Sequence, residues 1–116
     1  MILDTQQTRT QDTTVTADIT YFDNFKGTAH VKVTVASKHM INEDEVIVSS
    51  DWFIFKQTDN NSVLVWTSDE DASIPADYMT LGKNSQGLLT IIGYNHADYQ
   101  YQARSIAEAI DYFIAL

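Results

Sequence analysis

The chain has 116 residues, of which 44% are hydrophobic, and 16 carboxylates against seven Lys and Arg give a formal net charge of −9. This length fits one domain with a single core, and the composition excludes a disordered chain. The absence of cysteine excludes a disulfide scaffold and thiol chemistry, and it favours the cytoplasm. No apolar run reaches the roughly 18 residues of a membrane-spanning helix, and the first residues lack the pattern of a signal peptide.

The chain begins with a polar stretch that has no apolar period. We expect residues 1–12 to form a flexible tail in front of one domain, residues 13–116. From Thr13 onward apolar and polar residues alternate, which is typical of a half-buried strand. A turn at Gly27 and a second alternating run over 28–38 complete a predicted hairpin.

The middle of the chain predicts a second strand pair. A third strand begins at Val46, and residues 49–51 interrupt its alternation as a bulge or a short break. The following stretch, 52–55, is apolar on both faces, as expected for a central strand. A two-residue turn at Asn60-Asn61 would place Phe55 opposite Trp66, with both aromatic rings on one face of the sheet.

Three shorter strands and a helix complete the predicted fold. We expect strands over 78–81, 88–92 and 99–103, and the second of these is apolar on both faces, which predicts a central or covered strand. Ser105 and Glu108 have the spacing of a capping box, followed by apolar residues at helical intervals. The sequence therefore predicts an α+β fold, an antiparallel meander of about six to seven strands with one C-terminal helix packed on it.

Two stretches resemble the pleckstrin-homology superfold. The sequence WFIFK at 52–56, followed by a turn and VLVW at 63–66, looks like a strand pair of that family. The pattern A-x-S-x-x-E-x-x-x-Y-F at 103–113 is similar to its last strand and helix, although Tyr112 stands where the family usually has tryptophan. The resemblance implies a PH-like barrel, whereas the residue pattern also allows an open sheet. The first hairpin loop lacks the family's basic residues, so the resemblance implies a protein-interaction module rather than a phosphoinositide binder.

The carboxylates are concentrated in one part of the chain. Nine of the 16 lie between residues 42 and 77, where only Lys56 opposes them. Such a segment repels phosphate, which argues against nucleic acid and anionic membranes as ligands. It favours a protein partner with a basic surface, although acidic loops also serve simply to keep a small sheet protein soluble.

We therefore predict a small acidic protein-interaction domain. The candidate contact residues are seven carboxylates and one apolar anchor: Glu43, Asp44, Glu45, Asp69, Glu70, Asp71, Asp77 and Trp66. One alternative is a phage or bacterial inhibitor whose carboxylates imitate the phosphates of nucleic acid. Another is a small-ligand-binding barrel or cup lined by Phe53, Phe55, Leu64 and Trp66. The sequence leaves the oligomeric state open.

Motifs for catalysis and for metal binding are absent or incomplete. None of the three histidines has the spacing of a zinc site. Residues 69–73 begin like a calcium-binding loop, but Ile74 replaces the required glycine and Thr80 replaces the final glutamate. The chain has no glycine-rich phosphate loop and no nucleophile-elbow motif. We therefore expect no enzyme activity, no cofactor and no metal.

Overall fold

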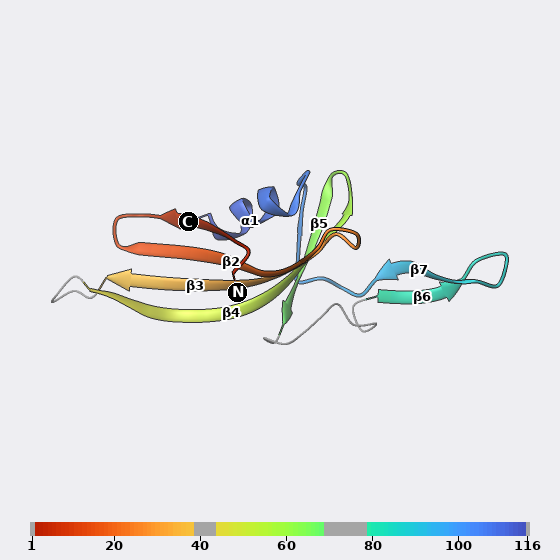
Figure 1. Ribbon diagram of the computed structural model, residues 1–116, viewed down its shortest axis with the longest axis horizontal. Helices are drawn as coiled ribbons and strands as arrows, with labels where there is room; N and C mark the ends of the chain where they lie inside the picture. Colours follow the sequence, from red (N-terminus) through yellow and green to blue (C-terminus); the bar gives the residue numbers. More distant parts are fainter. Residues whose placement is uncertain (1, 39–43, 69–78, 116) are drawn as a thin grey trace.

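The computed structural model describes residues 2–38, 44–68 and 79–115. Over these residues the chain forms a six-stranded antiparallel sheet, a separate two-stranded sheet and one C-terminal helix (Figure 1). The elements are β1 (Asp4–Arg9), β2 (Thr13–Asp23), β3 (Thr28–Lys38), β4 (Glu45–Asp59), β5 (Ser62–Ser68), β6 (Met79–Lys83), β7 (Leu89–Tyr94), β8 (Tyr99–Tyr101) and α1 (Ile106–Ile114). The larger sheet has the order β1-β2-β3-β4-β5-β8 and is not closed into a barrel. The predicted fold class is confirmed in its open form, and the barrel is not formed.

Residues 4–9, which were expected to belong to a flexible tail, form the strand β1. This strand pairs antiparallel with β2, from Asp4 opposite Ile19 to Arg9 opposite Thr14. The Gln6 side-chain amide donates to the Ala107 carbonyl (2.9 Å). A polar edge strand is held by backbone hydrogen bonds alone. Its sequence therefore shows no alternation of apolar and polar residues from which the strand could be predicted.

The long central strands follow the predicted alternation. Val15, Ala17 and Ile19 of β2 and Val31 and Val33 of β3 are all buried. The predicted interruption at 49–51 does not end β4, which continues through it. A bulge lies beside it instead, because Val35 is opposite Ser49 while its neighbour Ala36 is opposite Ile47.

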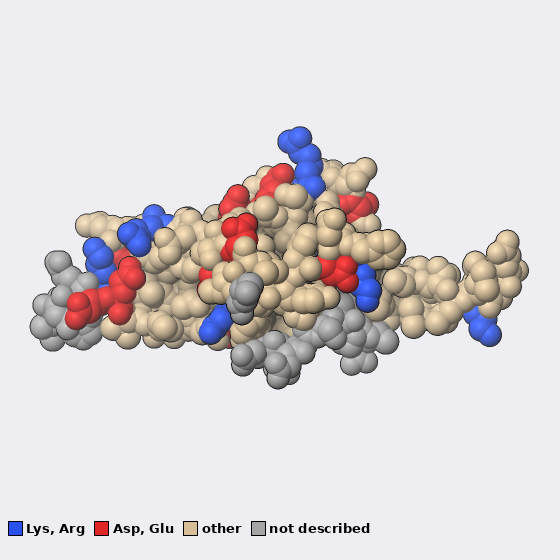
Figure 2. Space-filling model, in the orientation of Figure 1, with Lys and Arg blue, Asp and Glu red and all other residues tan. Residues whose placement is uncertain are grey.

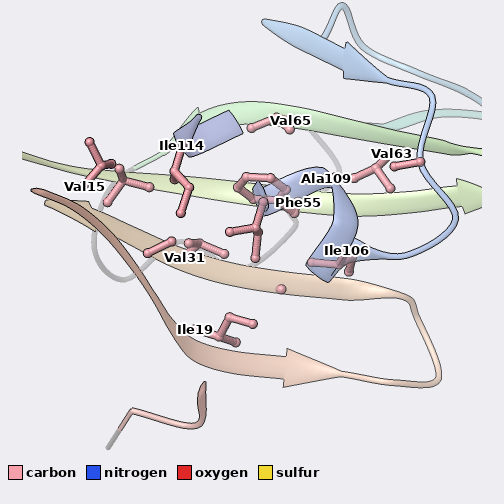
Figure 3. Packing of buried hydrophobic residues seen from close by; sticks show 14 residues of the cluster. Val15, Ile19, Val31, Phe55, Val63, Val65, Ile106, Ala109 and Ile114 are labelled. Carbon is pink, nitrogen blue, oxygen red and sulfur yellow. The ribbon is translucent and has the colours of Figure 1, made fainter. Parts of the chain in front are cut away.

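Helix α1 packs on one face of the larger sheet and encloses the core. Its buried residues Ile106, Ala109, Ile110 and Ile114 belong to one cluster with Phe55 and with valines of β2, β3 and β5 (Figure 3). The helix begins as predicted, since the Ser105 hydroxyl accepts from the Glu108 amide (3.1 Å).

The predicted register between β4 and β5 is wrong by one residue. Phe55 is opposite Val65, and Trp66 is opposite Ile54. The cause is an irregularity at Thr58, which is skipped in the pairing between Gln57–Val63 and Asp59–Ser62. A one-residue shift reverses the faces of all later side chains, so Phe55 and Trp66 lie on opposite faces of the sheet.

The hairpin β6–β7 stands apart from the larger sheet. It is the two-stranded sheet, and it extends from one end of the molecule (Figure 1). The extents of the described residues are 66 × 26 × 24 Å. Within that part of the chain, no helix is long and apolar enough to cross a membrane.

Candidate functional site

The acidic candidate residues are only partly within the structure. Glu43, Asp69, Glu70, Asp71 and Asp77 lie outside the described residues. Asp44 and Glu45 are described, and both are exposed where β4 begins. The proposed acidic contact therefore rests largely on sequence.

The described carboxylates of this segment do not gather in one patch. Glu45 and Asp59 are the first and last residues of β4, so 14 rises of about 3.3 Å separate them by roughly 45 Å. Glu45 also lies opposite Lys38 in the β3–β4 pair and accepts from the Thr14 hydroxyl (3.1 Å). Acidic and basic side chains occur side by side at this end of the molecule (Figure 2). Over the described ranges, the strongly acidic segment is thus divided between distant positions and is partly offset by bases.

Trp66 is not placed as an exposed anchor. Only 3% of its surface is exposed. Its indole N–H donates to the Asn95 carbonyl (3.3 Å), and its ring lies 6.1 Å from the ring of Tyr94. The side chain therefore joins β5 to the base of the β6–β7 hairpin, and a partner cannot reach it in this arrangement.

The predicted aromatic cup is not formed. Phe55 is fully buried, and the Phe113 ring of α1 covers it at 5.4 Å between ring centroids. The same Phe113 ring lies 4.7 Å from Phe53. Since Trp66 lies on the other face of the sheet, these side chains line no common pocket.

An apolar surface that we did not predict lies on the β6–β7 hairpin. The strand over 88–92 was expected to be central or covered, yet Leu89 is 70% exposed and Ile92 is 64% exposed. Leu81, Leu88 and Ile91 are exposed as well. The sequence signal for this surface is the presence of apolar residues on both faces of the strand, which predicts burial but does not show that the burial occurs within this chain. We call this set, Leu81, Leu88, Leu89, Ile91 and Ile92, the apolar arm.

A second unpredicted feature is an open strand edge in β4. Strand β5 pairs with β4 only from Trp52 to Asp59, so residues 45–51 have β3 on one side and no described strand on the other. Within this half, Ile47 and Val48 are 67% and 65% exposed, and Val46 is half exposed. We call residues 45–51 the open edge. The backbone N–H and C=O groups that point away from β3 have no partner strand among the described residues.

The titratable groups of the described part do not assemble into a reactive centre. Burial lowers the pKa of His30, and its Nε2 atom is buried with no hydrogen-bond partner. Hydrogen bonds from Thr67 lower the pKa of Asp98, whose carboxylate accepts from the Thr67 amide at 2.7 Å. No group of three or more His, Asp or Glu suited to a metal ion occurs within the described ranges. Asp98 stabilises the backbone at the end of β5, whereas His30 lies two strands away on β3.

One open apolar pocket lies at the start of α1. Leu3, Ile19, Phe22 and Ile106 line it, and its volume is about 510 Å³. Its lining offers one carboxylate, Asp4, and a few neutral polar groups. The pocket therefore has no convergent set of polar groups that would orient a substrate.

Comparison with family models, curated proteins and solved structures finds no match to this chain. Over the described residues, the architecture is an open antiparallel sheet with one covering helix, a projecting apolar hairpin and a strand edge that no described strand pairs with. The features that bear on function are therefore the apolar arm and the open edge.

Proposed function

We propose that this chain is a protein-interaction module without enzyme activity, and that the apolar arm is its main binding element. The single observation that carries the proposal is the exposure of five large aliphatic side chains on one projecting hairpin. Large apolar side chains exposed together on one element, rather than scattered singly, mark interaction sites in soluble proteins.

The projecting β6–β7 hairpin has little stability of its own. A two-stranded sheet is at best marginally stable in water, and it normally needs a third strand or a packed face. Here the base of the hairpin is attached to the body through Trp66, whose ring lies against Tyr94 and whose indole N–H donates to the Asn95 carbonyl. The outer part has no such support among the described residues. Binding to another protein would supply the missing apolar contact.

The experiment compares substitutions in the arm with a matched exposed residue elsewhere. The double variant Leu89→Lys and Ile92→Thr replaces the two most exposed side chains of the arm with a charged and a polar one. Phe25→Ser is the control, because Phe25 is 98% exposed in the β2–β3 turn, outside the β6–β7 hairpin. It lines a pocket with Tyr94 at the base of the hairpin but is not one of the arm residues. We expect cross-linking to protein partners, including other copies of the chain, to be lost in the double variant and kept in the control. Equal cross-linking of all three proteins would refute the proposal.

The charge of the chain supports a second, electrostatic candidate. With a net charge of −9, a basic protein partner would be attracted, and neutralising Asp69, Glu70 and Asp71 together would weaken its binding. Such binding weakens as salt is added. If the partner is a nucleic-acid-binding protein, the inhibitor alternative further predicts competition with DNA or RNA. Binding that is indifferent to salt and to this triple change would exclude the electrostatic candidate.

A further inference from the structure

We infer that the apolar arm of one chain adds to the open edge of β4 in a second copy, so that copies associate head to tail. This inference rests on the proposed function and identifies the partner as the chain itself. The contact is β-strand addition, in which backbone hydrogen bonds join the strands and side chains on the two faces set the fit.

The acceptor is unusual among the edges of this molecule. The two outer strands of the large sheet are protected: β1 is polar with a charged residue at each end, and β8 has only three residues. Short or charged edge strands are common means of preventing edge-to-edge pairing. The open edge of β4 is neither short nor charged at its centre, where Val46, Ile47 and Val48 are consecutive and exposed, and the bulge at Val48 is the only protective feature there among the described residues.

The donor has the complementary deficiency. The hairpin that carries the arm has strands of five and six residues. Their lengths are close to that of the open edge, which has seven residues. In the β6–β7 pair, Leu81 is opposite Ile91 and Lys83 is opposite Leu89, so these four side chains share one face. An added pair of strands would extend the large sheet and cover the exposed valines and isoleucine of β4.

The charges of the two surfaces favour this pairing over pairing of like with like. Lys83 is the only charged residue between 79 and 94. The open edge carries Glu45 and Asp51, one at each end. The Glu45 carboxylate already accepts from the Thr14 hydroxyl across β3, so Asp51 is the carboxylate of the open edge that is available to Lys83. Two open edges would bring only carboxylates together, and two arms would bring only lysines together, which is unfavourable in either case.

The position of the two surfaces makes the contact intermolecular. The arm extends from one end of the 66 Å molecule, and the open edge lies toward the opposite end (Figure 1). The arm therefore does not reach the open edge of its own chain in this conformation. A head-to-tail contact of different surfaces produces rings or filaments, unless two copies exchange arms reciprocally.

The test uses two variants that damage opposite surfaces. Ile47→Lys places a charge in the open edge and leaves the arm intact, whereas the double variant Leu89→Lys and Ile92→Thr damages only the arm. Circular dichroism and tryptophan fluorescence verify that each variant is folded. Sedimentation velocity then follows the wild type, each variant alone and an equal mixture of the two, over a wide concentration range, with Phe25→Ser as control.

We expect the wild type and the control to associate as concentration rises. Each variant alone should associate more weakly by roughly tenfold, or should not associate at all. The mixture should form a dimer that grows no further, because only one intact arm and one intact edge meet. A mixture that stays monomeric while the wild type associates would overturn the inference. A monomeric wild type that still cross-links other proteins through its arm would overturn it while leaving the proposed function standing. A monomeric wild type without arm-dependent cross-linking would overturn both.

Discussion

Phe113 connects the helix to the aromatic residues of the large sheet. Its ring meets Phe53, Phe55 and Tyr99 edge-on, at centroid distances of 4.7, 5.4 and 5.3 Å. Edge-on aromatic pairs add to the stabilisation that burial provides. One side chain thus joins β4, β8 and the last turn of α1.

Phe113→Ala should lower the free energy of unfolding by about 3 kcal/mol, because it removes apolar contact on three sides and leaves a cavity. Urea denaturation measures the loss. Tyr112→Phe is the matched control, since Tyr112 is exposed and its hydroxyl donates only to Glu108 of the same helix (2.9 Å). Its effect should stay within about 0.5 kcal/mol. Equal losses in both variants would contradict this role for Phe113.

His30 makes the stability of the sheet depend on pH. Its ring lies 5.2 Å from Tyr21 and its pKa is held below the usual 6.5 by burial. The folded protein therefore binds this proton less readily than the unfolded chain. The free energy of unfolding is therefore unaffected by His30 above about pH 6.5. It decreases as the pH falls from there toward the lower pKa of the folded state.

His30→Phe keeps a ring against Tyr21 and removes the titration. We expect the unfolding free energy of the wild type to fall more steeply than that of the variant as the pH decreases below about 6.5. Urea denaturation at several pH values gives both curves. Parallel curves would show that protonation of His30 does not oppose folding.

At the scale of elements, alternation and capping signals predicted most of the fold. The valines of β3 and the Ser105 cap correctly located a half-buried strand and the start of α1. The polar strand β1 left no hydrophobic signal, because its pairing uses the backbone alone. The irregularity at Thr58 was also invisible, since nothing in a run of strand formers indicates which residue is skipped, and it moved Trp66 to the other face.

The candidate site was less predictable than the fold for a physical reason. Apolar residues on both faces of Leu89–Tyr94 indicate that both faces are to be covered, but they do not indicate by which chain. The carboxylates gave a clear charge signal, yet a strand of 15 residues separates Glu45 from Asp59. These carboxylates are close in the sequence but lie far apart in the folded chain.

The arm should contribute little to the stability of the body. Replacing residues 81–92 with an Asn-Gly turn keeps Thr80, Tyr94 and the contact with Trp66, and removes only the projecting part. We expect the unfolding free energy of the large sheet to change by less than about 1 kcal/mol, because the outer arm packs on nothing else that is described. Thermal or urea unfolding followed by circular dichroism measures it. Loss of cooperative unfolding would show that the arm is part of the body.

For the whole molecule, net charge and shape act in opposite directions. A charge of −9 on every copy opposes self-association, whereas the exposed arm and the open edge favour it. Salt screens the repulsion over about 8 Å at physiological ionic strength. Association of copies through these surfaces should therefore strengthen as salt is added, which is the opposite of binding to a basic partner.

Hydrogen exchange as a function of protein concentration tests the central claim most directly. Amides of residues 45–51 and 79–94 can each be followed by mass spectrometry of the unmodified chain, with the β2–β3 turn around Phe25 as internal reference. Both segments should become protected together as concentration rises, more strongly at higher salt, while the turn does not change. Exchange that is independent of concentration in both segments, or protection of only one of them, would contradict it.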